Sequence, residues 1–164
     1  PMEVTTNMTL KKQFPSIVGV HFPLQTPGFC FVSIKKQKPG EALSIGRQIT
    51  SSVKIAKIAI VVDEDVNIHN RTEVMHAVGA RWQPFSASEI VKKAGAMGGD
   101  PSATKRGEGS RIVVDATRQW PEEGGPDNYS IMNRSCLTDA FPDIFNVIDE
   151  NWSHLIDDWK KGSN

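Results

Sequence analysis

The stretch that decides the fold is IAIVVDEDV, at residues 58–66. Its first five residues are apolar without alternation. This pattern indicates a strand buried on both faces, as in a parallel or mixed sheet with helices on each side. Three acids, Asp63, Glu64 and Asp65, follow the strand directly. Because ligands of open α/β sheets bind at the carboxyl ends of strands, the acids are candidates for chemistry as well as for structure.

Short segments rich in β-branched and aromatic residues lie on both sides of this strand. The segments at residues 16–22 and 29–34 enclose the turn sequence PLQTPG, which predicts two antiparallel strands. A weaker strand is expected at residues 88–94, and another at residues 111–117, which read RIVVDAT.

Two helices are expected between these strands. Pro39 and Glu41 suit the first turn of a helix, and an apolar stripe then continues to about residue 53. The second helix begins at Asn70, and Glu73 has the spacing of a capping box. The alternation of strands and helices predicts an α/β fold, with a mixed β-sheet flanked by helices.

The two ends of the chain differ from this central pattern. Residues 1–13 are polar and are expected to form a flexible segment, which leaves residues 14–137 as the α/β domain. Residues 138–160 are expected to form an amphipathic helix. Its apolar seam has heptad spacing and packs either on the chain's own core or on a second subunit. The seam residues are Phe145, Ile148, Trp152, Leu155 and Trp159.

Composition limits the classes of protein to which the chain can belong. The 164 residues suffice for one domain with a core, and the net charge of zero gives no general attraction to nucleic acid or acidic membranes. No apolar run approaches the roughly 20 residues that span a bilayer, and the first residues lack the apolar core of a signal peptide. We therefore expect a cytoplasmic protein without nucleic-acid or membrane partners. In that compartment Cys30 is expected to be a buried free thiol, and a disulfide with Cys136 is the alternative.

The acids after residue 62 allow more than one interpretation. Clustered carboxylates can hold Mg²⁺ through oxygen ligands. A receiver-type phosphoacceptor looks similar, but the order of acids typical of that class is missing. The structural interpretation is that Asp63, Glu64 and Asp65 cap the following turn and keep the strand end solvated.

Other candidate sites are weaker. The Gly-rich segment at residues 95–110 either cradles a phosphate group or is a plain loop, and it matches neither GxxxxGK[ST] nor GxGxxG. The chain has no CxxC and no closely spaced His/Cys set, so no structural zinc site is expected. The four histidines are expected to have ordinary surface or packing roles. They are His21, His69, His76 and His154.

Several blocks, taken in order, resemble the C-terminal domain of the UbiD family of decarboxylases. The similarity covers about residues 14–160, and a set of blocks in fixed order is more specific than any single block. The blocks are FPSIVGVHFP, FCFVSIKKQKPGEA, KIAIVVDEDVNIHNRTEVMHAVGARWQP, GDPSA, RIVVDAT and PDIFNVIDENW.

The resemblance implies reversible, non-oxidative decarboxylation of an aromatic or α,β-unsaturated acid. It implies prenylated FMN as cofactor, with a divalent metal (Mn²⁺ or Mg²⁺) and K⁺. In the family the cofactor-binding residues and the catalytic Arg–Glu–Glu network precede this domain, and this chain has no counterpart to them. We therefore expect no catalytic residue here, no cofactor bound by this chain alone, and no activity without a partner. The expected partner is an N-terminal flavin-binding domain or a large subunit, joined in a homo- or hetero-oligomer.

The resemblance also implies that this domain helps to form the dimer and closes one wall of the substrate pocket. The corresponding positions are Lys54, Ile55, Met97 and Gly99. A glycine at position 99 enlarges such a pocket, and a lysine at position 54 suits a polar or anionic substituent. The family's helix tryptophan is replaced by His76.

The resemblance further identifies the acids at 63–65 as a structural feature that organises the turn into the next helix. Arg81 and Asp115 are the expected partners. Val113 replaces the family's glycine before the IDAT-like segment.

Two other functions compete with this one. The chain can be a free-standing binding or assembly module that kept the fold and lost the chemistry. Alternatively, from the residues alone, it can be a Mg²⁺-dependent enzyme centred on the acids.

Overall fold

The computed structural model describes residues 2–95, 100–103, 105, 107–129 and 150. The chain forms two compact units, Pro1–Asp127 and Asn128–Asn164, and all the helices and strands named below lie in the first. The helix expected at residues 138–160 lies outside the described residues, Glu150 excepted.

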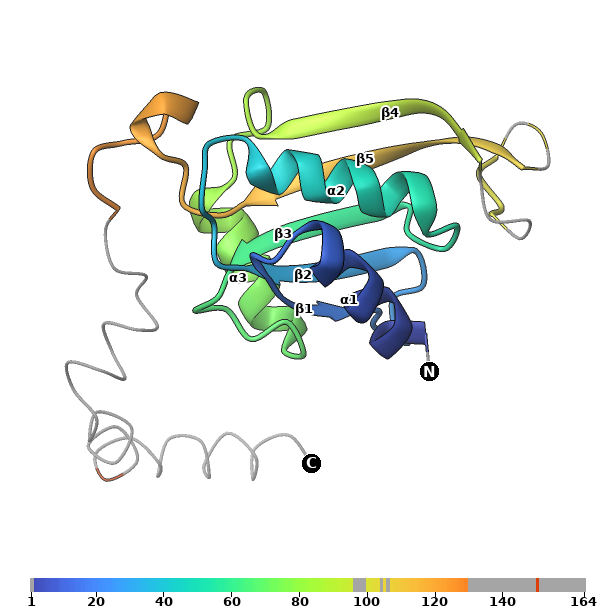
Figure 1. Cartoon of the computed structure of the whole chain (residues 1–164), viewed down its shortest axis with the longest axis horizontal. Coiled ribbons are helices and arrows are strands. Elements are labelled where there is room, and N and C mark those ends of the chain that lie inside the picture. Colours follow the sequence, from blue (N-terminus) through green and yellow to red (C-terminus); the bar gives the residue numbers. More distant parts are fainter. Residues whose placement is uncertain (1, 96–99, 104, 106, 130–149, 151–164) are drawn as a thin grey trace, which may run out of the picture. The chain divides into compact units, whose positions relative to one another are not determined.

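Five strands form one mixed sheet in the order β1-β2-β3-β5-β4 (Figure 1). The three inner strands β2, β3 and β5 run parallel, and β1 and β4 pair antiparallel at the two edges. This arrangement confirms the mixed α/β sheet that the sequence predicts. The strand bounds are β1 Ile17–His21, β2 Phe29–Ile34, β3 Ile58–Asp63, β4 Ser88–Gly95 and β5 Glu108–Ala116.

Helices cover both faces of this sheet. Helices α1 (Met2–Gln13) and α2 (Glu41–Ser52) pack on one face, and α3 (Arg71–Arg81) packs on the other (Figure 1). Strand β3 lies in the middle, and four of its six residues are buried. Its unbroken apolar sequence is explained by this position, since each face of the strand meets a helix.

Helix α1 differs from the expectation of a flexible segment over residues 1–13. Leu10 is buried in the core beside α2. Glu3 ties the helix to the end of β1, because its Oε1 accepts hydrogen bonds from the Phe22 backbone N–H at 2.7 Å and from His21 Nδ1 at 2.9 Å. One apolar anchor and one carboxylate therefore hold a segment whose composition is mostly polar.

Helix α3 begins where the capping pattern predicts. The Asn70 side chain accepts a hydrogen bond from the Thr72 backbone N–H and donates one to Glu73, which in turn accepts from the Asn67 backbone. The helix therefore starts at a fixed point after β3.

Two further findings concern the expectations from composition. Cys30 is a buried free cysteine, as expected. Among the described residues, no helix combines the length and the apolar character needed to cross a membrane.

Candidate functional site

The acids that follow β3 meet an arginine at the end of α3. Arg81 donates hydrogen bonds to Asp63 Oδ2 at 2.9 Å and to both carboxylate oxygens of Asp65, at 3.0 and 2.8 Å. Its side chain is only 3% exposed, so these two carboxylates compensate a buried positive charge. The turn from β3 to α3 is thus closed by the pairing expected for Arg81.

Arg118, which follows β5, adds a second cation to the same acids. Its backbone N–H donates to Asp63 Oδ2 at 2.8 Å, and its guanidinium pairs with Asp65. Burial raises the pKa of Asp63 and outweighs the bond from Arg118 and the charge of Arg81. Burial acts in the same direction on Asp65, but its bonds to Arg81 and the nearby positive charges bring its pKa below the usual value.

These contacts favour the structural interpretation of the acids over a Mg²⁺ site. The carboxylates of Asp63 and Asp65 point at guanidinium groups, and Glu64 is exposed. Within the described part of the chain, no group of three or more His, Cys, Asp or Glu residues is placed to hold a metal ion.

Asp115, the other residue expected to partner these acids, lies on β5, is 1% exposed and bonds to Thr117. One of its carboxylate oxygens accepts hydrogen bonds from the backbone N–H of Thr117 at 2.9 Å and from its hydroxyl at 2.6 Å. Burial raises the pKa of Asp115, against these two bonds. The acid therefore organises the chain immediately after β5.

A lysine that the sequence patterns do not single out lies at the carboxyl ends of the parallel strands, and its side chain is buried. Lys36, after β2, is 3% exposed and donates to Glu123 Oε2 at 2.7 Å and to Thr117 Oγ1 at 2.9 Å. Glu123 also accepts from the backbone N–H groups of Gly40 and Trp120, each at 2.7 Å. The ends of β2, β3 and β5 are thus bound together by polar contacts within the protein.

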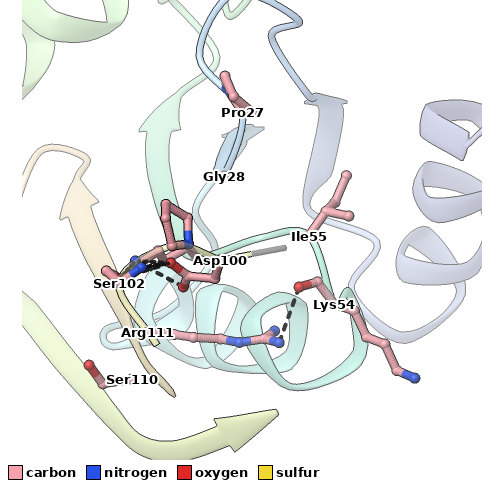
Figure 2. Close-up of a pocket in the computed structure, with 10 residues that line it drawn as sticks. Pro27, Gly28, Lys54, Ile55, Asp100, Ser102, Ser110 and Arg111 are labelled. Atoms are coloured by element: carbon pink, nitrogen blue, oxygen red, sulfur yellow. Dashed lines mark hydrogen bonds and ion pairs between the residues drawn. The ribbon is translucent and has the colours of Figure 1, made fainter. Parts of the chain in front are cut away.

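One cavity lies at the opposite end of the sheet, where the parallel strands begin (Figure 2). Its volume is about 360 Å³. It is built from the loop before β2, the turn between α2 and β3, the start of β5 and part of the Gly-rich segment. The lining includes Gly28, Lys54, Ile55, Asp100, Ser110 and Arg111.

Two of the four expected pocket-wall residues, Lys54 and Ile55, therefore line this cavity. The other two, Met97 and Gly99, lie outside the described residues. Lys54 is exposed, and its ammonium group points away from Asp100 and Ser102 in Figure 2.

Arg111 forms a fixed side of the cavity. Its guanidinium donates to the carbonyl oxygens of Thr50, of Val53 at 2.9 Å and of Lys54 at 3.3 Å. These carbonyls belong to the last turn of α2 and the residues after it, where a positive charge is favourable. Arg111 is 5% exposed, and burial lowers its pKa.

A lysine at the start of β3 holds the Gly-rich segment against the cavity. Lys57 Nζ lies 2.9 Å from Asp100 Oδ2 and donates to the Ser102 hydroxyl. The Asp100 carboxylate also accepts from the Ser102 backbone N–H at 3.0 Å. The hydrogen bonds from Lys57 and Ser102 lower the pKa of Asp100 to about 2, so the carboxylate is ionised at neutral pH.

Three charged side chains that line the cavity interact with other groups of the protein. The charged groups of Lys57, Asp100 and Arg111 are engaged with the protein itself. The phosphate-cradle interpretation of residues 95–110 depends partly on residues outside the described ranges.

Two histidines lie together although they are far apart in sequence. The rings of His21 and His69 have centroids 4.5 Å apart, beside a second cavity of about 370 Å³ at the start of α3. Their spacing along the chain gives no signal for this contact, which joins the end of β1 to the loop before α3. His76 is exposed on α3, and His154 lies outside the described residues.

Comparison with known proteins gives one family. The model of the 3-octaprenyl-4-hydroxybenzoate carboxy-lyase C-terminal domain matches residues 1–116. An uncharacterized protein of Archaeoglobus fulgidus is 34% identical over 119 residues, which is 70% of this chain and 25% of that protein. An uncharacterized protein of Aquifex aeolicus is 28% identical over 150 residues, 89% of this chain and 30% of its own length.

Solved structures agree with this family. The vanillic acid decarboxylase of Sedimentibacter hydroxybenzoicus in its closed form superposes with a TM-score of 0.74 at 26% identity, covering 89% of this chain and 31% of that one. The UbiD-class enzyme HmfF of Pelotomaculum thermopropionicum, in complex with FMN, superposes with a TM-score of 0.66 at 29% identity. This match covers 79% of this chain and 29% of that one. This chain therefore spans about a quarter to a third of the proteins it matches.

Proposed function

Because the chain belongs to the family of the 3-octaprenyl-4-hydroxybenzoate carboxy-lyase C-terminal domain, the UbiD family, we propose that it is the C-terminal part or small subunit of a UbiD-type carboxy-lyase. The complete enzyme would reversibly decarboxylate an aromatic or α,β-unsaturated acid. The family match carries this proposal, because it extends through all five strands and through all the residues that line the cavity.

Within that enzyme we assign the cavity at the start of the parallel strands to one wall of the substrate pocket. Lys54 and Ile55 line it, and the ion pair of Lys57 and Asp100 fixes one rim. A wall of this kind shapes the bound acid and excludes water, while the cofactor supplies the reactive chemistry. Met97 and Gly99 belong to the same proposed wall.

The cofactor is assigned to the part of the enzyme that this chain lacks. One related structure holds FMN and another form of the same enzyme holds prFMN. The described acids of this chain do not fit the metal, since those at 63 and 65 are paired with arginines and Asp100 with Lys57. Prenylated FMN, the divalent metal and K⁺ would therefore be bound outside this chain.

The partner is then the remaining flavin-binding part, either a separate large subunit or the preceding domain of one polypeptide. It would account for the two-thirds or more of the relatives' length that this chain does not cover. We place the assembled oligomer in the cytoplasm. The alternative is an assembly or binding module that kept the fold without the chemistry.

Co-expression tests the proposal. The chain is produced with its genomic neighbours and a flavin prenyltransferase and is then purified by a tag on this chain. The visible spectrum and intact masses of the purified material are measured, followed by a screen of aromatic acids for CO₂ release. A larger UbiD-type partner that carries a flavin supports the proposal. A colourless homodimer, obtained with the same neighbours present, supports the assembly module instead.

A further inference from the structure

Among the described residues, the apolar side chains on the sheet face that carries α3 are buried to different extents along the strands. Farther along the parallel strands, Phe31, Ile60 and Val114 are 1%, 3% and 6% exposed. Two residues earlier on the same strands, and so on the same face, Phe29, Ile58 and Ile112 are only partly buried. The burial of apolar side chains on this face thus decreases toward the start of each parallel strand.

A fourth strand extends this partly covered row. Ile90 of β4 is directly opposite Ile112, which in turn pairs with Ile58, and Ile58 pairs with Phe29. Ile90 is 63% exposed. These four residues, here called the open row, cross β2, β3, β5 and β4 in register on one face of the sheet.

The position of α3 explains why the row is open. The salt bridges of Arg81 with Asp63 and Asp65 fix the end of the helix beside the carboxyl end of β3. In Figure 1, α3 lies at that end of the sheet, whereas the opposite face carries both α1 and α2. No other helix of the described residues packs on the α3 face.

We propose that the open row is the surface on which the larger, flavin-binding part of the enzyme docks. This inference depends on the proposed function, which requires such a part. The remaining two-thirds or more of the relatives' length supplies a partner large enough to cover the row. An apolar row across four strands calls for an apolar surface on that partner.

The row also adjoins the cavity. Ser110 lines the cavity and lies two residues before Ile112 on β5, so both side chains are on the same face. A partner seated on the open row would therefore reach the mouth of the cavity. Under this proposal, the partner that docks on the open row also closes the pocket at this wall.

Thiol labelling tests this docking surface directly. Ile90→Cys and, as a matched control, Leu24→Cys are made in a Cys136→Ser background. Leu24 is 92% exposed on the β1–β2 loop, and Cys30 is fully buried. Labelling rates are measured for the 164-residue chain alone and for the complete enzyme, with the flavin-binding part supplied as a subunit or as the preceding domain.

We expect the thiol of the Ile90→Cys variant to react more than tenfold more slowly in the complete enzyme, while that of Leu24→Cys keeps its rate. Unchanged labelling of Ile90→Cys in a flavin-bearing complex overturns the docking surface and leaves the proposed function intact. Failure of any UbiD-type part to join this chain overturns both. If the thiol of Ile90→Cys is already protected from labelling in the isolated chain, the inference is also contradicted. If that protection increases with the concentration of the chain, the occupant of the open row is a second copy of the chain.

Discussion

Gly46 of α2 lies directly against Val113 of β5. A Cβ at residue 46 would overlap Val113 Cγ1 and would lie 3.2 Å from Val113 Cβ. The helix therefore approaches the sheet closely because residue 46 has no side chain. The family resemblance implies a glycine at position 113, so in this chain a small residue on the helix faces a large one on the strand.

Gly46→Ala is therefore expected to lower the free energy of unfolding by about 1–3 kcal/mol through overpacking. Adding Val113→Ala should recover part of this loss, since the two residues are in contact. Urea denaturation measures both effects. Gly79→Ala is the control, because a Cβ added at Gly79 of α3 would have no neighbouring atom within 4 Å, and this variant should gain up to about 1 kcal/mol. Equal stability of the two alanine variants would contradict the close approach.

Arg81→Met removes the cation shared by Asp63 and Asp65. We expect the free energy of unfolding to fall by about 3 kcal/mol, because a partly buried carboxylate loses its partner. The control is Arg71→Met, at an exposed position at the start of α3, where a change within about 0.5 kcal/mol is expected. A stability of Arg81→Met equal to that of the control would show that the pair does not hold the turn.

Asp65→Ala separates the structural interpretation of the acids from the Mg²⁺ site. The structural interpretation predicts a lower melting temperature for this variant, because Arg81 and Arg118 lose a carboxylate. It also predicts that Mg²⁺ leaves the melting temperature of the unsubstituted chain unchanged, since a ligand stabilises only a protein that binds it. Loss of measurable Mg²⁺ binding, with an unchanged melting temperature, would favour the metal site instead.

The sequence predicts those parts of the fold that depend on local patterns. The apolar run before Asp63 places β3 in the sheet, and the Asn70 and Glu73 spacing places the start of α3. The pairing of Arg81 with the acids follows from the family resemblance, and Asp115, the other expected partner, bonds to Thr117.

Contacts between distant segments are not predictable in this way. The Lys36–Glu123 pair joins residues 87 positions apart, and neither has a spacing that signals the other. The cavity likewise is lined by four separate segments, so local patterns do not predict it. Its proposed wall residues follow from the family resemblance alone. The sequence does not predict helix α1, because its segment is largely polar and a single buried residue, Leu10, packs in the core.

Lys57→Met tests the ion pair at the rim of the cavity through pH. The pKa of Asp100 is about 2, so its stabilising contribution is present above the unfolded pKa of about 3.9 and is lost as the pH falls toward 2. In Lys57→Met the pKa of Asp100 should rise toward the ordinary value. Carboxyl NMR titration measures it, and Lys35→Met, at an exposed site, is the control. A midpoint near 4 in the unsubstituted chain would refute the pair.

Ile55→Trp tests the pocket wall in the complete enzyme. The larger side chain should occupy part of the 360 Å³ cavity. The ratio of kcat/KM for a bulky aromatic acid to that for a small one should then fall about tenfold, since larger substrates lose their space first. Met75→Trp, half-exposed on α3, is the matched control and should leave the ratio unchanged. If Ile55→Trp lowers turnover of both acids equally, or changes neither, the cavity does not contact substrate and the wall must be sought elsewhere in the domain.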